Sequence, residues 1–186
     1  PISLDLGTAT AGGIVSACES DAPPPVTDPW NVAVEWTYAS SGDGVNVMPA
    51  VGNLTDDNGD GLVNDDDIPD IAFVTADFMG TGPDTLVALS GDGSGVLFEV
   101  TGFSGLGGVL IADVTGDGVP EVIAGTSGAG VAAVDGTGTT LWSTGRFGSM
   151  VGYPQPAVAD LDGDGDVEVI YDVAVVSTQR TTPRAP

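Results

Sequence analysis

The sequence predicts an all-β fold of short antiparallel, propeller-blade-like repeats, an incomplete or open β-propeller with almost no helix. Three segments share one pattern: an apolar strand, a Gly/Asp-rich loop, then a Pro or Val and an acid that begin a second strand. They are residues 48–75, 108–126 and 155–173. Asp113 and Asp160 hold the same place in two repeats and are 47 positions apart. A period of roughly 40–50 residues with four short strands per unit is typical of a propeller blade.

Ten short strands are expected, because each apolar run ends at Gly, Asp or Pro and none keeps a helical period for more than two turns. They are residues 45–51, 70–76, 85–90, 96–101, 109–114, 121–126, 131–136, 140–144, 156–161 and 167–173. Two Gly-rich hairpins, 86–102 and 130–145, carry an aromatic residue on the return strand. Trp36 is predicted to lie on the same strand of a preceding unit. We expect Trp36, Phe98 and Trp142 to pack between blades instead of forming a platform for sugars.

Three regions are predicted. Residues 1–29 form an N-terminal extension, in which 2–15 is a possible donated strand; 30–176 hold the repeats, with loops at 53–70, 113–121 and 160–168; and 177–186 form a polar, Pro-rich tail. A linker, a disordered end and an O-glycan site all remain open for that tail. Small residues precede Cys18, as in a lipidated cysteine. Residues 1–14 contain no Lys or Arg, however, which favours a free or externally paired thiol.

Composition restricts the chemistry. The chain has 186 residues, 27 acids, three arginines and no lysine or histidine, for a formal charge of −24, yet 41% of its residues are hydrophobic. A core is therefore available, and phosphate-rich nucleic acid is an unlikely partner. Without histidine there is no Ser-His-Asp triad or histidine-bound zinc, and without lysine there is no Schiff base or Walker loop. The remaining ligands are oxygens, which bind hard cations such as Ca²⁺. No segment reaches the roughly 20 apolar residues of a membrane-spanning helix.

The second and third loops have alternating oxygen donors. Positions 1, 3 and 5 of a tight turn converge, position 7 offers its carbonyl, and the acid at position 9 completes the shell. In the third loop these positions hold Asp160, Asp162, Asp164, Asp166 and Glu168. In the second loop they hold Asp113, Thr115, Asp117, Val119 and Glu121. The second loop has fewer carboxylates, so we expect weaker binding there. Plain acidic turns are the alternative, but four carboxylates in one turn repel one another unless a cation is bound.

The first loop has the spacing of a twelve-residue calcium loop in residues 56–67. Its predicted ligands are Asp56, Asn58, Asp60, Leu62 through its carbonyl, Asn64 and Asp67. A strand-like run follows, and Pro69 opposes a helix, so the loop is interpreted as an insertion within a blade. Asn53 begins a glycosylation sequon, but it also aligns with the first ligand position of the other two loops. Both roles remain open from the sequence.

The loop pattern resembles the FG-GAP and VCBS repeats, which are related to the integrin alpha-subunit propeller. In that family a D-x-[DN]-x-D-G-x-x-[DE] loop joins two strands of each blade and holds calcium. The third loop fits at every place, the second has Thr115 substituted, and the first fits once its insertion is allowed for. The resemblance covers residues 45–176. It implies an extracellular or cell-surface protein concerned with adhesion, matrix or carbohydrate contact.

Two classes of function are compatible with these observations. The first is a non-catalytic, calcium-stabilised extracellular module for adhesion or structural self-assembly, which includes the formation of filaments. The second is an enzyme acting on polysaccharide, or a carbohydrate-binding accessory part of a larger propeller protein. The obvious carboxylate pairs lie inside the predicted calcium loops, where a metal would occupy them, which favours the first class.

The length of the chain bears on its partners. Propellers close with four or more blades, and this chain supplies two complete units and the first half of a third. It is expected either to belong to a longer chain or to pair with other copies of itself through open sheet edges. Glycans or surface proteins are further possible partners.

Overall fold

The computed structural model describes residues 32–39, 44–77, 84–147 and 154–178. The chain divides into two units, Pro1–Glu35 and Trp36–Pro186, and every strand belongs to the second. The predicted donated strand, Cys18, the boundary at 29/30 and the tail from 179 onward lie outside the described residues. Within those residues all regular structure is β, in agreement with the predicted fold class.

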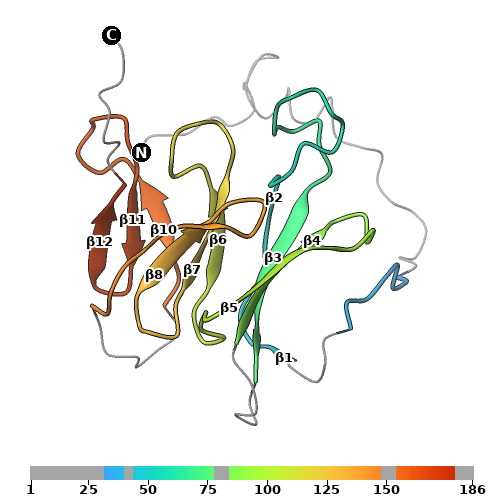
Figure 1. Ribbon diagram of the computed structural model, residues 1–186, viewed down its shortest axis with the longest axis horizontal. Coiled ribbons are helices and arrows are strands. Elements are labelled where there is room, and N and C mark those ends of the chain that lie inside the picture. The colour runs from blue at the N-terminus through green and yellow to red at the C-terminus, as the bar shows by residue number, and fades with distance from the viewer. Residues whose placement is uncertain (1–31, 40–43, 78–83, 148–153, 179–186) are drawn as a thin grey trace, which may run out of the picture. The chain divides into compact units, whose positions relative to one another are not determined.

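The described residues form twelve strands, which are arranged as three antiparallel sheets, none of which closes into a barrel (Figure 1). The first sheet contains β1 (Gly44–Val45), β2 (Ala50–Gly52), β3 (Asp70–Ala76), β4 (Thr85–Ser90) and β5 (Val96–Thr101). The second contains β6 (Val109–Ala112), β7 (Glu121–Gly125), β8 (Val131–Val134) and β9 (Thr140–Ser143). The third contains β10 (Ala157–Ala159), β11 (Glu168–Tyr171) and β12 (Ala174–Ser177).

The second and third sheets are built in chain order, so that each of their strands pairs with the next one along the sequence. The second sheet has the order β6-β7-β8-β9 and the third has the order β10-β11-β12. In the first sheet β1 and β2 both pair with β3, where one strand was predicted over 45–51. Pro49 lies between them; it has no N–H to donate to a sheet ladder, which explains the interruption. Such successive meanders are the blade-like units that the sequence predicted.

The third sheet has one strand more than the sequence predicted. β12 follows β11 through a two-residue turn, with Tyr171 opposite Ala174. Asp172 in that turn has a φ of 55°. Aspartate tolerates this left-handed conformation better than most residues, and a turn of this kind matches the twist of a hairpin. The third unit therefore contains three strands.

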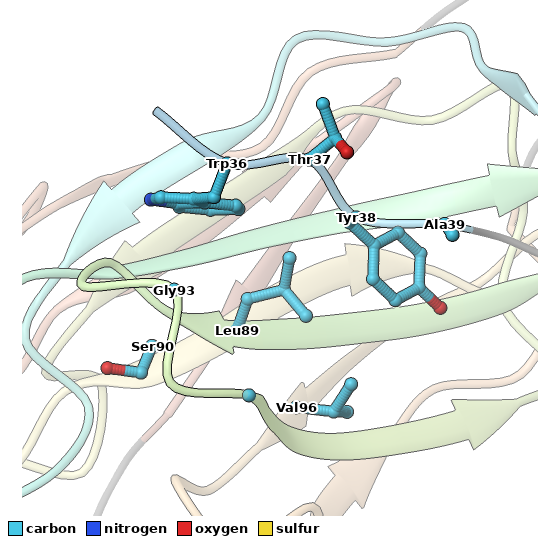
Figure 2. A pocket seen from close by; sticks show the side chains of 9 residues that line it. Trp36, Thr37, Tyr38, Ala39, Leu89, Ser90, Gly93 and Val96 are labelled. Atoms are coloured by element: carbon cyan, nitrogen blue, oxygen red, sulfur yellow. The ribbon is translucent and has the colours of Figure 1, made fainter. Parts of the chain in front are cut away.

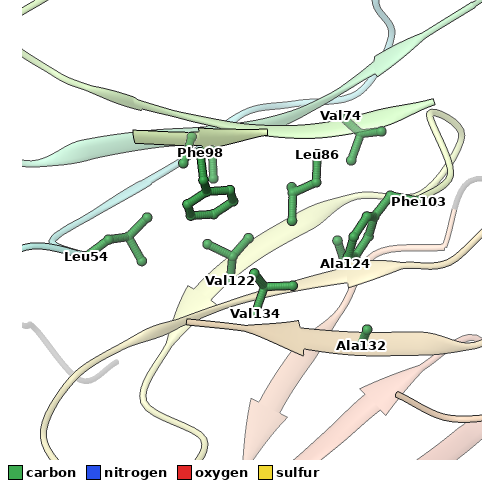
Figure 3. Close-up of a cluster of buried hydrophobic side chains, with 11 residues drawn as sticks. Leu54, Val74, Leu86, Phe98, Phe103, Val122, Ala124, Ala132 and Val134 are labelled. Atoms are coloured by element: carbon green, nitrogen blue, oxygen red, sulfur yellow. The ribbon is translucent and has the colours of Figure 1, made fainter. Parts of the chain in front are cut away.

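The two central strands of the second sheet, β7 and β8, are buried on both faces. Because successive side chains on a strand point to opposite faces, β7 sends Val122 and Ala124 to one side and Ile123 to the other. The first side joins a cluster with the first sheet that includes Leu86 and Phe98 (Figure 3). The second side joins Val169 and Tyr171 of the third sheet. These two hydrophobic clusters hold consecutive sheets together and thereby fix the loops at their ends.

Two of the three aromatic residues expected between blades do lie there. Phe98 is buried in the cluster between the first and second sheets, and Trp142 packs, partly buried, against the cluster between the second and third. The expectation for Trp36 was wrong. Residues 32–39 form no strand, and Trp36 stays 37% exposed.

Candidate metal sites

Each of the three predicted loops connects two consecutive strands, β2 to β3, β6 to β7 and β10 to β11, and the loops lie at the same end of the sheets (Figure 1). They share one backbone scaffold. The first acid of each loop accepts N–H groups from the third and the fifth residue after it. The donors are Gly59 and Gly61 to Asp56, Gly116 and Gly118 to Asp113, and Gly163 and Gly165 to Asp160.

All six of these donors are glycines with a positive φ, from 67° to 94°. Glycine adopts this conformation without steric cost, so the alternating glycines of the sequence are what allow each loop to wrap around its first acid. The loops therefore have a common shape in spite of their different acids. That shape turns the first acid of each loop toward the inside of its turn.

The second loop brings three carboxylates together. One oxygen each of Asp113, Asp117 and Glu121 lie within 4.8 Å of one another. The hydroxyl of Thr115 donates to Glu121 Oε1 at 3.2 Å, and the N–H of Val114 donates to Glu121 Oε2 at 2.8 Å. Burial raises the pKa of Glu121 above its usual value, and the hydrogen bonds from Val114 and Thr115 offset part of that rise. Such a buried carboxylate is stabilised when a cation binds beside it.

The third loop gathers Asp160, Asp162 and Glu168, again with one oxygen of each within 4.8 Å of the others. Glu168 is buried and accepts the N–H of Leu161 at 2.8 Å, as Glu121 accepts that of Val114. Asp164 does not belong to this group; its carboxylate accepts the N–H of Asp166 at 2.9 Å. The remaining predicted ligands, Val119 and Asp166, stand at the seventh positions and would offer carbonyl oxygens.

The inserted loop has the same turn but a looser set of acids. Its predicted ligands do not form a group of three carboxylates of the kind found, among the described residues, in the other two loops. Asp67 is buried and accepts N–H groups from Asp57, Asn58 and Asn64. Asp60 accepts the N–H of Leu62 at 2.8 Å. Amide oxygens from Asn58 and Asn64 would supply the rest of a shell here.

Sequence analysis missed one acid, Asp70. It is the first residue of β3, just as Glu121 and Glu168 are the first residues of β7 and β11. It is fully buried and accepts the N–H of Leu54 at 2.8 Å, and burial raises its pKa above the usual value. The signal was present in the sequence, since an acid follows Pro69 in the first repeat as one follows Pro120 in the second. The prediction instead took Asp67, inside the inserted loop, as the last ligand of the first repeat.

A small pocket of about 130 Å³ lies away from the loops, between residues 36–39 and the β4–β5 hairpin (Figure 2). The Trp36 ring covers Gly93, where an added β-carbon would lie 2.8 Å from ring atoms. The Tyr38 hydroxyl donates to Glu99 at 2.9 Å, and its ring meets Phe73 edge-on at a centroid distance of 5.6 Å. No carboxylate lines this pocket.

Comparison with known proteins supports the repeat assignment. Residues 113–171, which contain the second and third loops, match the model of an FG-GAP-like repeat. The predicted resemblance to FG-GAP repeats is thereby confirmed for this part of the chain. No curated protein matches the chain.

One solved structure that is similar to this chain is the crystal structure of the V. cholerae biofilm matrix protein Bap1. The match has 28% sequence identity and a TM-score of 0.63, and it covers 72% of this chain. This chain spans 23% of the length of that protein. Together with the repeat match, this similarity supports a β-rich repeat architecture for the chain. The described residues contain no helix that could cross a membrane.

Proposed function

We propose that this chain is a calcium-stabilised extracellular repeat module that serves adhesion or structural assembly and is not itself catalytic. The observation that carries the proposal is the geometry of the second and third loops, where three carboxylate oxygens lie within 4.8 Å of one another in each. Like charges at such distances repel, and a hard divalent cation replaces that repulsion with attraction. The residues present fit Ca²⁺, because all of them offer oxygen.

Calcium would act on the architecture. Each loop connects two neighbouring strands, and the buried acid that closes it begins the second of those strands. An ion held by Asp160 and Glu168, for example, ties the end of β10 to the start of β11. Because the unfolded chain lacks this arrangement, the free energy of ion binding adds to the free energy of folding.

An extracellular or cell-surface location follows from the same reasoning. Millimolar calcium outside cells saturates sites of modest affinity, such as extracellular modules use. The similar solved structure is that of a biofilm matrix protein, which supports a role in a matrix or at a surface.

The proposed partners are other copies of this chain or the rest of a longer chain, joined through open sheet edges. Within the described residues β12 pairs only with β11, and the third sheet has three strands where the second has four. Val175 on β12 is 59% exposed. An exposed edge strand offers unpaired N–H and C=O groups to another strand. We expect Val175→Lys to reduce self-association in light scattering, whereas Val34→Lys, outside the strands, leaves it unchanged.

The central test is a thermal melt with chelator and with added calcium, together with calorimetric titration of the chelated protein. We expect chelation to lower the melting temperature and calcium to restore it; one site at a free ion concentration of 100 Kd contributes about 2.7 kcal/mol. Magnesium is the control ion, since it demands a smaller and stricter octahedral shell. Equal melting temperatures with chelator and with calcium would overturn the proposal.

A further inference from the structure

The base of the insertion repeats the spacing of the ligand positions in the second loop. Asn53, Thr55 and Asp57 are spaced as Asp113, Thr115 and Asp117 are. The closing acid is Asp70 in one and Glu121 in the other, each at the start of the second strand. The inserted residues therefore separate the fifth position from the closing acid without removing either.

The hydrogen bonds of the two places correspond. Leu54 donates its N–H to Asp70 as Val114 does to Glu121, both at 2.8 Å. The hydroxyl of Thr55 donates to Asp70 at 3.2 Å, and that of Thr115 donates to Glu121 at the same distance. Asp57 repels the Asp70 carboxyl as Asp117 repels Glu121. The base of the insertion thus keeps the hydrogen bonds that surround the closing acid of the second loop.

Two buried oxygens at this base lack a partner. Both hydrogen bonds to Asp70 reach Oδ2, whereas Oδ1 is buried and accepts no hydrogen bond from the described residues. Asn53 Oδ1 is likewise buried and without a donor. Leaving a fully buried carboxylate oxygen unpaired is unfavourable, because it loses its hydrogen bonds to water and gains none in the fold. A bound cation would remove that cost at both oxygens.

We propose that Asn53, Asp57 and Asp70 bind a divalent cation of the calcium class at the base of the insertion, separate from the ion of the inserted loop. The inference rests on the proposed function only in taking calcium as the ion. Side-chain oxygens of the three residues provide the protein ligands, and water completes the shell, as is common for hard cations. The first repeat then holds two ions, where the second and third hold one each.

The two ions of the first repeat are coupled through shared hydrogen bonds. Asp57 donates its N–H to Asp67 Oδ1 at 3.1 Å, and Asn64 donates its N–H to Asp67 Oδ2 at 2.8 Å. The Asn53 side-chain amide in turn donates to the Asn64 carbonyl. An ion that orders Asp67 therefore also orders the residues beneath it, so that occupation of one site increases the affinity of the other.

The experiment counts calcium ions on the intact chain by native mass spectrometry and measures affinity by calorimetry. We expect four ions on the wild type and three on Asp70→Asn. Asn53→Asp gives the base the first acid that the other loops have, and we expect it to tighten one class of sites about tenfold. Asn46→Asp adds the same charge at an exposed position outside the loops and leaves every affinity unchanged.

The outcomes separate the two proposals. Three ions on the wild type, with no change in binding for Asn53→Asp, would overturn the base site and leave the proposed function standing. No bound calcium at all would overturn the proposed function and the base site with it. If Asp70→Asn does not fold, Asn53→Asp decides alone, because it adds a ligand and removes no buried group. Asp67→Asn tests the coupling, since it should also weaken the base site, and an unchanged base affinity would exclude it.

Discussion

The hydroxyl of Tyr171 lies directly against the backbone of Gly125. A β-carbon built on Gly125 would lie 1.9 Å from Tyr171 Oη and 2.8 Å from Cζ. Gly125 ends β7 in the second sheet and Tyr171 ends β11 in the third. The absence of a side chain at 125 therefore allows these two neighbouring sheets to approach, and the tyrosine fills the space.

Gly125→Ala should destabilise the protein by about 1–3 kcal/mol, the usual cost of overpacking a filled core. The backbone of Gly125 does not have a positive φ, so the cost comes from the collision and not from the alanine backbone. Chemical denaturation measures the change. Gly145→Ala is the matched control, because an added β-carbon there meets nothing within 4 Å.

A second variant tests the cause of that loss. Tyr171→Phe removes the atom at 1.9 Å but leaves the ring atom at 2.8 Å, so it should relieve part of the Gly125→Ala penalty. The interaction is measured as a double-mutant cycle. Strictly additive effects of the two substitutions would contradict the proposed contact.

Tyr171 should also make the protein sensitive to alkali. Burial raises the pKa of its phenol to about 12, from an ordinary 10.0. The fold therefore favours the neutral phenol, and this contribution is complete below pH 10 and is lost as the pH rises toward 12. With about 1.4 kcal/mol per pKa unit, the free energy of unfolding should fall by about 2–3 kcal/mol across that range. Tyr171→Phe should flatten this slope in denaturation curves, whereas Tyr38→Phe should leave it in place.

Loss of an acid from the third loop should weaken calcium binding. Asp160→Asn removes the carboxylate that accepts Gly163 and Gly165 and belongs to the group of three. We expect the calcium-induced rise in melting temperature to shrink, and one class of sites to lose about tenfold or more in affinity. Asp172→Asn makes the same change of charge at an exposed turn outside the loops. An equal loss in both variants would indicate a general effect of charge.

Sequence patterns were sufficient for the strands whose two ends carry turn residues. The strands predicted at 70–76, 85–90 and 96–101 match β3, β4 and β5 to the residue. The sequence patterns failed where a turn contains no glycine. β12 was missed because the turn before it consists of Asp172 and Val173. The strand predicted around Trp36 failed for another reason, since an apolar run specifies a strand only when a partner strand is available.

The clusters of acids in the two shorter loops were predictable because each loop is contiguous, so that spacing alone places the acids at positions 1 and 9. Asp70 was not identified because an insertion separates it from Asn53, which takes the first ligand position. The inserted residues 56–67 have the complete spacing of a twelve-residue calcium loop, so the prediction stopped there. The pairing of Gly52 with Asp70 across β2 and β3 brings the two sides of that insertion together. That information lies in the sheet register and not in the spacing of the acids.

The second loop offers a substitution that should increase binding. Thr115 takes the position that Asp162 has in the third loop, and its hydroxyl donates a hydrogen bond to Glu121. Thr115→Asp would add a third-position carboxylate to Asp113, Asp117 and Glu121. Without calcium the four acids should repel, which lowers the melting temperature of the chelated protein. With calcium the added ligand should tighten this site about tenfold, so that the difference between the chelated and saturated melting temperatures widens.

Thr115→Asn, which adds an amide oxygen without charge, is the control and should give a smaller gain. Should Thr115→Asp lower the melting temperature equally with and without calcium, the side chain at 115 does not face the ion, and the assignment of the third position would be wrong.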